Sequence, residues 1–264
     1  PTIAQLDALD APPAGLVVAS PANPTGTMLP APELLALADW CDAHGTRLIS
    51  DEIYHGITYG DRPTSARTIG HNAIVVNSFS KYFSMTGWRI GWLVVPDELL
   101  DAVDRLAGNF TICPPALSQL AAVAAFDAYD ELDANVARYA ANRKMLLDLL
   151  PEVGLDRLAP ADGAFYIYAD VSRWTTDSLG FAARLLAATG VALAPGVDFD
   201  PVDGGRFVRM CFAGDGTELE AGVAIMGEWL GRQPQLDEQR LVSAAARPAR
   251  APRPGSRRGR RPVS

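Results

Sequence analysis

The chain has few of the residues that build disulfide frameworks, metal sites and membrane spans. Its three cysteines, Cys41, Cys113 and Cys211, are odd in number and far apart, and its three histidines show no metal-ligand spacing. Neither a disulfide framework nor a metal site is therefore expected, and the cysteines are predicted to be buried thiols. The longest apolar stretch, residues 114–126, is shorter than the roughly 20 residues that cross a bilayer, so no membrane contact is predicted.

Basic residues are also in the minority. The 264 residues include 23 Lys or Arg against 31 Asp or Glu, a formal net charge of −8, which argues against a nucleic-acid partner. Residues 1–20 lack the basic start and apolar middle of a secretory signal, so the predicted location is cytoplasmic. Hydrophobic residues make up 48% of the chain, enough for a sizeable core.

Lysine is the scarcest charged residue. Only Lys81 and Lys144 occur, and arginine supplies the rest of the positive charge. Arginine cannot replace lysine where a neutral amine must attack a carbonyl, so each lysine is a candidate for chemistry. Lys144 lies inside a helical pattern and is predicted to be a surface residue.

Short apolar runs alternate with helical patterns through the first 150 residues. Because the runs do not alternate polar with apolar residues, they indicate strands that are buried on both faces, and the fold class is α/β: a mixed, mostly parallel sheet covered by helices. The predicted strands are 15–20, 47–50, 73–78 and 89–95, and the predicted helices are 33–43, 97–107, 116–129 and 131–150, the last closed by Pro151.

The pattern then becomes smaller and more mixed, which predicts a second, α+β domain. It has expected strands at 164–171 and near residues 191 and 207, and helices at 178–189 and 218–230. The predicted domains are a partial large domain (1–150), a small C-terminal domain (151–231) and a disordered tail (232–264). Arg240–Ser264 holds eight arginines, four prolines and no acid. This composition fits either a solvated tail or one that binds nucleic acid or another acidic partner.

Polar clusters lie at the ends of the proposed strands. In an open α/β sheet the carboxyl ends of the strands bind ligands, so these clusters are expected to form one site. Each has a plain alternative: a turn, a helix cap, loop hydroxyls or a surface charge. The clusters are Asn23-Pro24-Thr25-Gly26, Asp51-Glu52-Ile53-Tyr54, Ser78-Phe79-Ser80-Lys81 and Arg89.

Together these side chains suit a phosphorylated heteroaromatic aldehyde. The carboxylate of Asp51 can hold a positively charged ring nitrogen, and the amine of Lys81 can form a Schiff base. Donors suited to a phosphate dianion or a phenolate oxygen come from Ser78, Arg89, Tyr54 and Asn23.

The order of these motifs resembles that of class I/II aminotransferases, which are fold type I pyridoxal phosphate enzymes. The likeness covers about residues 14–231. It is carried by Ser20-Pro21-Ala22-Asn23-Pro24-Thr25-Gly26, Ser78-Phe79-Ser80-Lys81, Thr86-Gly87-Trp88-Arg89-Ile90-Gly91 and Phe207-Val208-Arg209-Met210-Cys211-Phe212-Ala213.

The resemblance implies a cofactor, pyridoxal 5'-phosphate, and a role for each matching residue. Lys81 would be the Schiff-base lysine, Asp51 would pair with the pyridine nitrogen, and Arg209 would bind the substrate α-carboxylate. The remaining cofactor contacts would come from Asn23 and Tyr54 at the phenolic oxygen, and from Ser78, Ser80 and Arg89 around the phosphate. Lys81, Asp51 and Tyr54 would be the catalytic residues, and Asn23 would also touch the substrate.

The implied reaction moves an amino group from an α-amino acid to a 2-oxo acid in a ping-pong cycle, and the family's active sites imply a homodimer. Two other outcomes remain open. A β-eliminating lyase of the same fold would use the same lysine. A transcription regulator with an aminotransferase-like domain would need a helix-turn-helix, and nothing in the chain resembles one.

The chain departs from the family most clearly at its start. Family members carry roughly a third of their length before the Asn-Pro-Thr-Gly turn, whereas about twenty residues precede Asn23 here. The sequence is therefore interpreted as a fragment or a short member. The absent strands would leave an apolar sheet edge exposed. A smaller departure lies at residues 195–200, where Asp200 follows Phe199 in place of the family's usual glycine.

Overall fold

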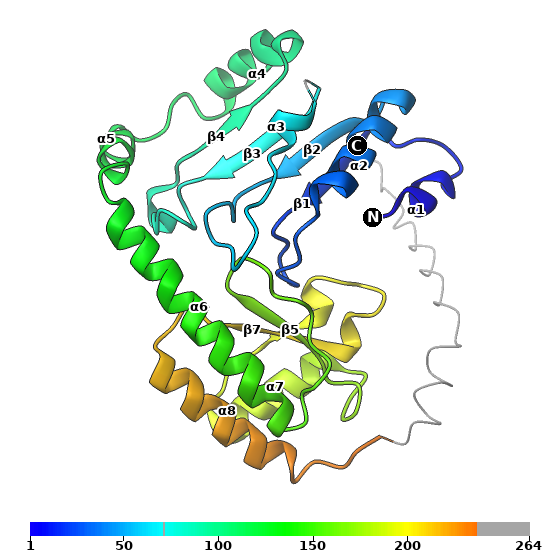
Figure 1. The fold of residues 1–264 in the computed structure, drawn as a ribbon, viewed down its shortest axis with the longest axis vertical. Helices are drawn as coiled ribbons and strands as arrows, with labels where there is room; N and C mark the ends of the chain where they lie inside the picture. The colour runs from blue at the N-terminus through cyan, green and yellow to red at the C-terminus, as the bar shows by residue number, and fades with distance from the viewer. Residues whose placement is uncertain (71, 237–264) are drawn as a thin grey trace, which may run out of the picture.

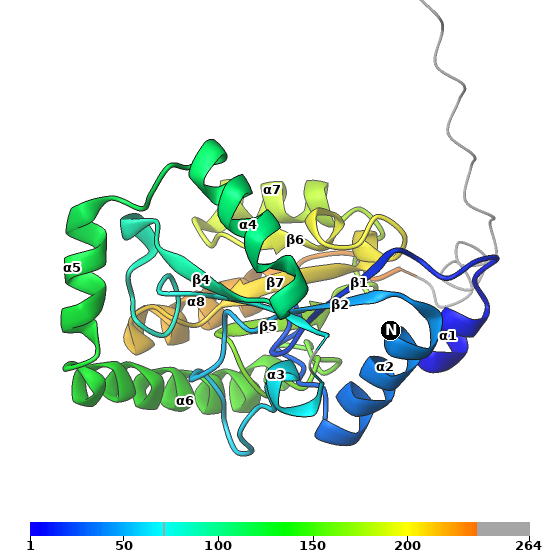
Figure 2. The same cartoon turned by 90° about the horizontal axis from the view of Figure 1, so that it is seen from above.

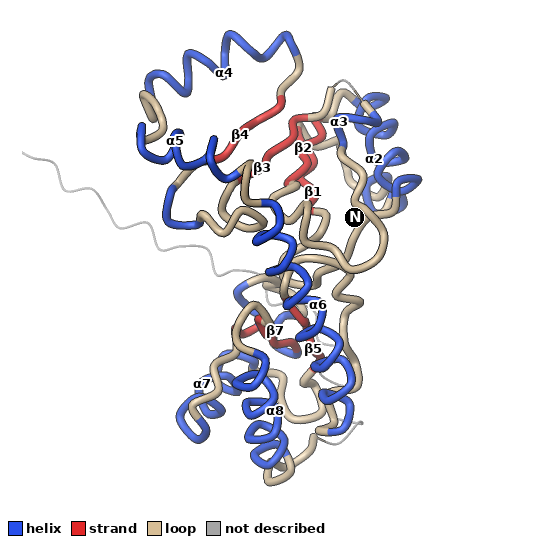
Figure 3. The backbone as a smooth tube through the Cα atoms, turned by 60° about the vertical axis from the view of Figure 1, so that its left-hand side comes forward, coloured by secondary structure: helices blue, strands red, loops and turns tan. Residues whose placement is uncertain are grey.

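A computed structural model describes residues 1–70 and 72–236. It has two groups of strands, one above the other along the long axis, and helix α6 (Tyr129–Glu152) runs from near the lower end of the first group down beside the second (Figures 1 and 3). The Arg-rich tail, Arg240–Ser264, lies outside the described residues.

The first sheet is mixed and mostly parallel, so the predicted α/β fold class is confirmed. Its strand order is β1-β2-β3-β4, with the first three parallel and β4 antiparallel to β3. The strands are β1 (Gly15–Ala19), β2 (Arg47–Asp51), β3 (Ile74–Ser78) and β4 (Gly91–Val94). Their parallel carboxyl ends meet at one edge, where the polar clusters begin.

Helix α2 (Ala31–His44) covers one face of this sheet. Leu34, Leu37 and Cys41 are buried and pack with residues of β1, β2 and β3, as the sequence pattern predicts. The helix ends at Gly45, whose φ of 66° suits glycine. The short helices α1 (Ile3–Asp7) and α3 (Ala66–Ile69) contribute Leu6 and Ala66 to the same core.

Strand β4 forms the edge of the sheet next to β3 and leads into α4 (Asp97–Phe110) and α5 (Ala116–Ala125). We call these three elements the arm (residues 91–125). Helix α4 has no buried residue among those described, and Leu93 of β4 is 51% exposed. The prediction that the strands are buried on both faces is therefore wrong for β4, whose residues are exposed or half-buried, and for β1 at Val17, which is 66% exposed. In Figure 2, α5 lies at one end of the molecule and α1 and α2 lie at the other.

Helix α6 connects the arm to the C-terminal region (residues 153–236). It begins at Tyr129, so the predicted helix over 116–129 in fact ends at Ala125. Pro151 does not close α6, contrary to the prediction; it lies inside the last turn, and the helix ends at Glu152. A proline inside a helix lacks the N–H that would donate to the carbonyl four residues earlier, and its ring crowds that carbonyl, so the helix continues for only one residue beyond Pro151.

The C-terminal region is a small antiparallel sheet packed against helices. Its strand order is β5-β7-β6, and its core contains Ile167, Leu185, Val208 and Phe212, all without exposed surface. The expected strand near residue 191 lies at 194–195. The elements are β5 (Tyr166–Asp170), α7 (Ser178–Thr189), β6 (Ala194–Pro195), β7 (Phe207–Cys211) and α8 (Gly216–Leu230), with short 3-10 turns at Thr86–Trp88, Gly196–Asp198 and Gly204–Arg206.

The cysteines only partly follow the prediction. All three are free thiols, and Cys41 is buried on the inner face of α2. Cys113 and Cys211 are exposed, so the prediction of buried thiols is wrong for both. Cys113 follows the uncovered helix α4, and Cys211 is the last residue of β7.

Candidate active site

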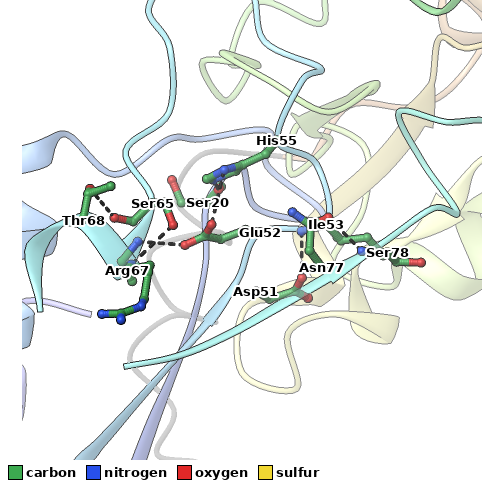
Figure 4. Close-up of polar contacts among 11 residues, drawn as sticks. Ser20, Asp51, Glu52, Ile53, His55, Ser65, Arg67, Thr68, Asn77 and Ser78 are labelled. Atoms are coloured by element: carbon green, nitrogen blue, oxygen red, sulfur yellow. Dashed lines mark hydrogen bonds and ion pairs between the residues drawn. The ribbon is translucent and has the colours of Figure 1, made fainter. Parts of the chain in front are cut away.

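The carboxyl ends of β1, β2 and β3 bring the predicted polar clusters to one edge of the first sheet. Asp51 is the last residue of β2, opposite Ala19 of β1 and Val76 of β3. Ser78 ends β3. The carboxylate of Asp51 accepts the backbone N–H of Ile53 through Oδ1, at 3.1 Å (Figure 4), which fixes the side chain at the strand end.

The Asn23 loop docks on the C-terminal region. Gly26 has a φ of 68°, and its carbonyl accepts the Gly163 N–H at 2.9 Å. A Cβ at Gly26 would lie 2.7 Å from the Gly163 carbonyl oxygen, so only glycine fits this contact. The loop thereby places Asn23 beside β7.

Arg209 of β7 meets Asn23 directly. Its Nη1 donates to Asn23 Oδ1 at 2.7 Å, and its guanidinium lies 4.2 Å from the ring centre of Tyr166 and 4.6 Å from that of Phe199. Rings on a guanidinium hold it by cation–π attraction. Arg209 Nε is buried and has no hydrogen-bond partner among the described residues.

Tyr54 faces the same aromatic cluster. Its side chain is buried, and its hydroxyl lies 2.9 Å from the hydroxyl of Tyr166. Burial raises the pKa of Tyr54 far above its ordinary value, with further contributions from Tyr166 and Asp51 against an opposing effect of Arg209. Tyr54 therefore stays protonated, as a hydrogen-bond donor must.

Lys81 lies in the turn after β3. Its Nζ is 5.6 Å from the ring centre of Tyr54 and 5.7 Å from that of Phe165, and it makes no hydrogen bond or ion pair with any of residues 1–70 and 72–236. Lys144, by contrast, is exposed and pairs with Asp148 at 2.6 Å, which confirms its predicted surface position. Lys81 thus lies against aromatic rings without an ion-pair partner among the described residues, whereas Lys144 forms an exposed ion pair.

Ser78, Ser80 and Arg89 form a second group. Ser78 Oγ donates to Ser80 Oγ at 2.9 Å and accepts the Ser80 N–H at 3.0 Å. Arg89 has a φ of 52° and donates from Nη1 to the Thr86 carbonyl at 2.9 Å. All three line an open pocket of about 630 Å³ between β4 and α4.

The predicted site residues therefore lie in two groups. Asn23, Tyr54, Lys81 and Arg209 surround one aromatic cluster, and the serines with Arg89 line the pocket. No hydrogen bond or ion pair among the described side chains joins the groups directly. Lys81 adjoins Ser80 in the chain, and Asp51 acts electrostatically on Tyr54, so both groups border the same strand ends.

Sequence reasoning missed Tyr166 and Phe199. The Tyr166 hydroxyl meets that of Tyr54, and the guanidinium of Arg209 lies over the rings of both Tyr166 and Phe199. The available signal was the aromatic run Phe165-Tyr166-Ile167-Tyr168, which is also typical of a core strand. Phe199 belongs to the segment where the family pattern is weakest.

The described residues contain no cluster of three or more His, Cys, Asp and Glu side chains that could hold a metal ion. Over the same residues, no helix combines the length and the apolar character needed to cross a membrane.

Comparison with known proteins identifies the family. Residues 2–225 match the family described as "Aminotransferase class I and II". Valine–pyruvate aminotransferase of Mycobacterium tuberculosis is 59% identical over 88% of this chain and 61% of its own length. Aspartate/prephenate aminotransferase of Thermus thermophilus is 36% identical over 82% of this chain and 56% of its own.

Solved structures agree with the sequence comparison. A crystal structure of an aminotransferase from Mycobacterium tuberculosis superposes with a TM-score of 0.86 at 59% identity, over 88% of this chain and 61% of that one. The chain belongs to the class I and II aminotransferase family, which confirms the resemblance. Members of this family use pyridoxal phosphate. The chain spans about three fifths of the length of these relatives.

Proposed function

We propose that this chain is the greater part of a pyridoxal phosphate-dependent aminotransferase that moves an amino group between an α-amino acid and a 2-oxo acid. The observation that carries the proposal is the position of the Lys81 amine. It has no polar partner among the described residues and faces Tyr54, whose hydroxyl meets Tyr166 beneath Arg209. A reactive amine and a carboxylate-binding guanidinium thus border one aromatic cluster.

The donor set fits the cofactor. In our proposal Lys81 attaches the aldehyde carbon, Asp51 pairs with the ring nitrogen, and the phosphate occupies the pocket of Ser78, Ser80 and Arg89. Asn23 and Tyr54 contact the phenolic oxygen, because an amide and a protonated hydroxyl can both donate. When bound, the cofactor supplies an electron sink that stabilises negative charge on the substrate Cα.

The chain's own residues bind the substrate and move its proton. Arg209 binds the α-carboxylate through its planar fork, which the rings of Tyr166 and Phe199 hold in place. The substrate amine would displace the Lys81 amine from the aldehyde carbon of the cofactor. The freed Lys81 amine would then take the proton from Cα and donate it to the carbon from which it was displaced, as a general base and then a general acid. Asp51 keeps the ring nitrogen positively charged, and Tyr54 stays protonated throughout.

Valine and pyruvate are the first substrates to test, because the relative with 59% identity is named for them. All the relatives reported above are named aminotransferases, which favours transamination over β-elimination and over a regulator. Arg209 would read only the carboxylate that all α-amino acids share.

The wider organisation follows the sequence predictions. We propose a large domain at 1–150, a small domain at 151–231, a homodimer and a cytoplasmic location without nucleic-acid or membrane partners. The exposed apolar residues of the arm support association, and the net charge of −8 argues against nucleic acid.

Absorbance spectra of the purified chain with pyridoxal phosphate test this function. We expect the absorbance band of a Schiff base in the wild-type protein and in Lys144→Ala, which removes the other lysine, and only the absorbance of the free aldehyde in Lys81→Ala. Addition of L-valine should convert the band to that of the pyridoxamine form, and pyruvate should restore it with release of alanine.

Two results would contradict the proposal. Identical spectra for the wild type and Lys81→Ala would mean that Lys81 does not hold the cofactor. A band that requires Lys81, together with release of ammonia from amino acids that carry a β leaving group and no transamination, would favour the lyase.

A further inference from the structure

Glu52 and His55 form a buried pair beside the proposed site. Glu52 is 3% exposed, and its Oε1 accepts the Ala66 N–H at 2.8 Å. Its Oε2 lies 3.4 Å from Nδ1 of His55. The other ring nitrogen of His55, Nε2, lies 3.0 Å from the Ser20 carbonyl oxygen. Figure 4 shows Glu52 and His55 close together, with Ser20 next to them and Asp51 to one side.

The partners of His55 determine where protons must be. A carbonyl oxygen can only accept, so Nε2 of His55 carries a hydrogen and donates to Ser20. Nδ1 of a neutral ring would then direct a lone pair at the Glu52 carboxylate. A second proton, on either Nδ1 or Oε2, turns that repulsion into attraction.

Burial favours an arrangement with no net charge. Desolvation lowers the pKa of His55, while the Glu52 carboxylate, the Ser20 carbonyl and Asp51 oppose this effect. Glu52 is itself almost fully buried, where an unpaired carboxylate is costly. One proton shared by the two side chains leaves the pair neutral.

The pair connects two parts of the proposed cofactor site. Ser20 begins the loop that carries Asn23, and its N–H donates to the Asp51 carbonyl at 3.2 Å. Its hydroxyl accepts the Leu29 N–H at 2.9 Å, which ties both ends of the loop together. Glu52 follows Asp51 directly, so an unpaired charge on Glu52 would repel the charge on Asp51.

We propose that Glu52 and His55 are positioning residues: by sharing one proton, they fix the Asn23 loop against β2 and keep Asp51 free of a second, uncompensated carboxylate. The proposal rests on the proposed function for the roles of Asp51 and Asn23. The state of the pair itself does not depend on the cofactor.

Histidine ¹⁵N NMR without cofactor tests the shared proton. The chain has three histidines, so His55→Gln identifies the His55 signals and His44→Gln is the matched control. We expect Nε2 of His55 to be protonated and Nδ1 to be protonated or to accept a strong hydrogen bond at neutral pH. Glu52→Gln should change the Nδ1 signal most. A bare Nδ1 in the wild type, unaffected by Glu52→Gln, would overturn the shared proton.

Cofactor titrations test the positioning role. We expect His55→Gln to weaken pyridoxal phosphate binding about tenfold, within the range of couplings in one hydrogen-bond network. The double variant Glu52→Gln/His55→Gln should recover most of that loss, because it removes the unpaired buried carboxylate. The control variant His44→Gln should leave pyridoxal phosphate binding unchanged.

A purely structural role predicts a different pattern. Two independent packing defects would add, so a double variant weaker than His55→Gln would overturn the positioning role, as would wild-type affinity in His55→Gln. If the wild-type chain binds no cofactor, the proposed function fails, and the NMR result still decides whether the pair shares a proton.

Discussion

The C-terminal region and the arm both contain strands and helices with apolar side chains, but these side chains are packed very differently. Apolar side chains of β5, β7, α7 and α8 form a closed core with α6. The apolar side chains of α4 and α5 instead face outward, and only Ala122 of the arm belongs to the small core around Phe79 and Met85. An amphipathic helix needs a partner surface. Within the described residues, α4 has no buried residue, and α5 packs on the small core through Ala121, Ala122 and Ala125.

The proposed site combines residues of the C-terminal region with a residue that lies close to the arm. Arg209 and Tyr166 come from the closed core, where packing and ring contacts hold them. Arg89, by contrast, is exposed and lies two residues before the arm. We infer that the carboxylate-binding side is preorganised by the chain itself, and that the phosphate side gains rigidity when the arm is covered.

The largest expected effect contrasts a core leucine with an arm leucine. Leu185 has no exposed surface, and Leu106 is 57% exposed. Leu185→Ala should lower the free energy of unfolding by about 2–5 kcal/mol, because it leaves a cavity. Leu106→Ala should change it by less than about 0.5 kcal/mol. Urea denaturation of both variants measures the difference, and equal losses would mean that the arm is packed in solution.

The next effect concerns the contact between the first sheet and the C-terminal region. Gly26 and Gly45 have nearly equal positive φ values, 68° and 66°, but only Gly26 would place a Cβ against another backbone. Gly45→Ala should cost about 1–2 kcal/mol for the left-handed conformation. Gly26→Ala should cost about 2–4 kcal/mol, since the overpacking adds to it.

The same urea measurement serves both glycine variants, and their difference isolates the steric contact. If Gly26→Ala were no worse than Gly45→Ala, the Asn23 loop would not be pressed against Gly163. Weakened cofactor binding in Gly26→Ala alone would link this contact to the site.

The sequence was sufficient to predict the sheet, the helices of both regions and the placement of the polar clusters at strand ends, because these depend on local periodicity and on chain order. The contact of Arg209 with Asn23 joins residues 186 positions apart, and that of Tyr54 with Tyr166 joins residues 112 apart. No local pattern encodes such pairs. The open face of β4 was missed for a related reason: an apolar run shows what a strand can bury, and not whether a partner is present.

A smaller effect should appear in self-association. Leu117 and Leu120 are exposed on α5, and Leu117 is 75% exposed. If the arm is the contact of a homodimer, Leu117→Gln should weaken dimerisation by about tenfold, as expected for one leucine removed from an apolar interface. Leu179→Gln on α7, where Leu179 is 60% exposed, is the control. Analytical ultracentrifugation that gives equal dissociation constants for the two variants would exclude the arm as that contact.

The smallest effect tests whether ion pairs contribute to the closed core. Lys144 on α6 pairs with Asp148 at 2.6 Å, but both side chains are largely exposed. The lysine precedes the acid along the helix, which is the weaker orientation for such a pair. Lys144→Ala should therefore change the free energy of unfolding by less than about 0.5 kcal/mol, and the change should stay below that value even at low salt, where screening is weakest. A larger, salt-dependent loss would mean that charge pairing on α6, and not apolar burial alone, separates the stable region from the arm.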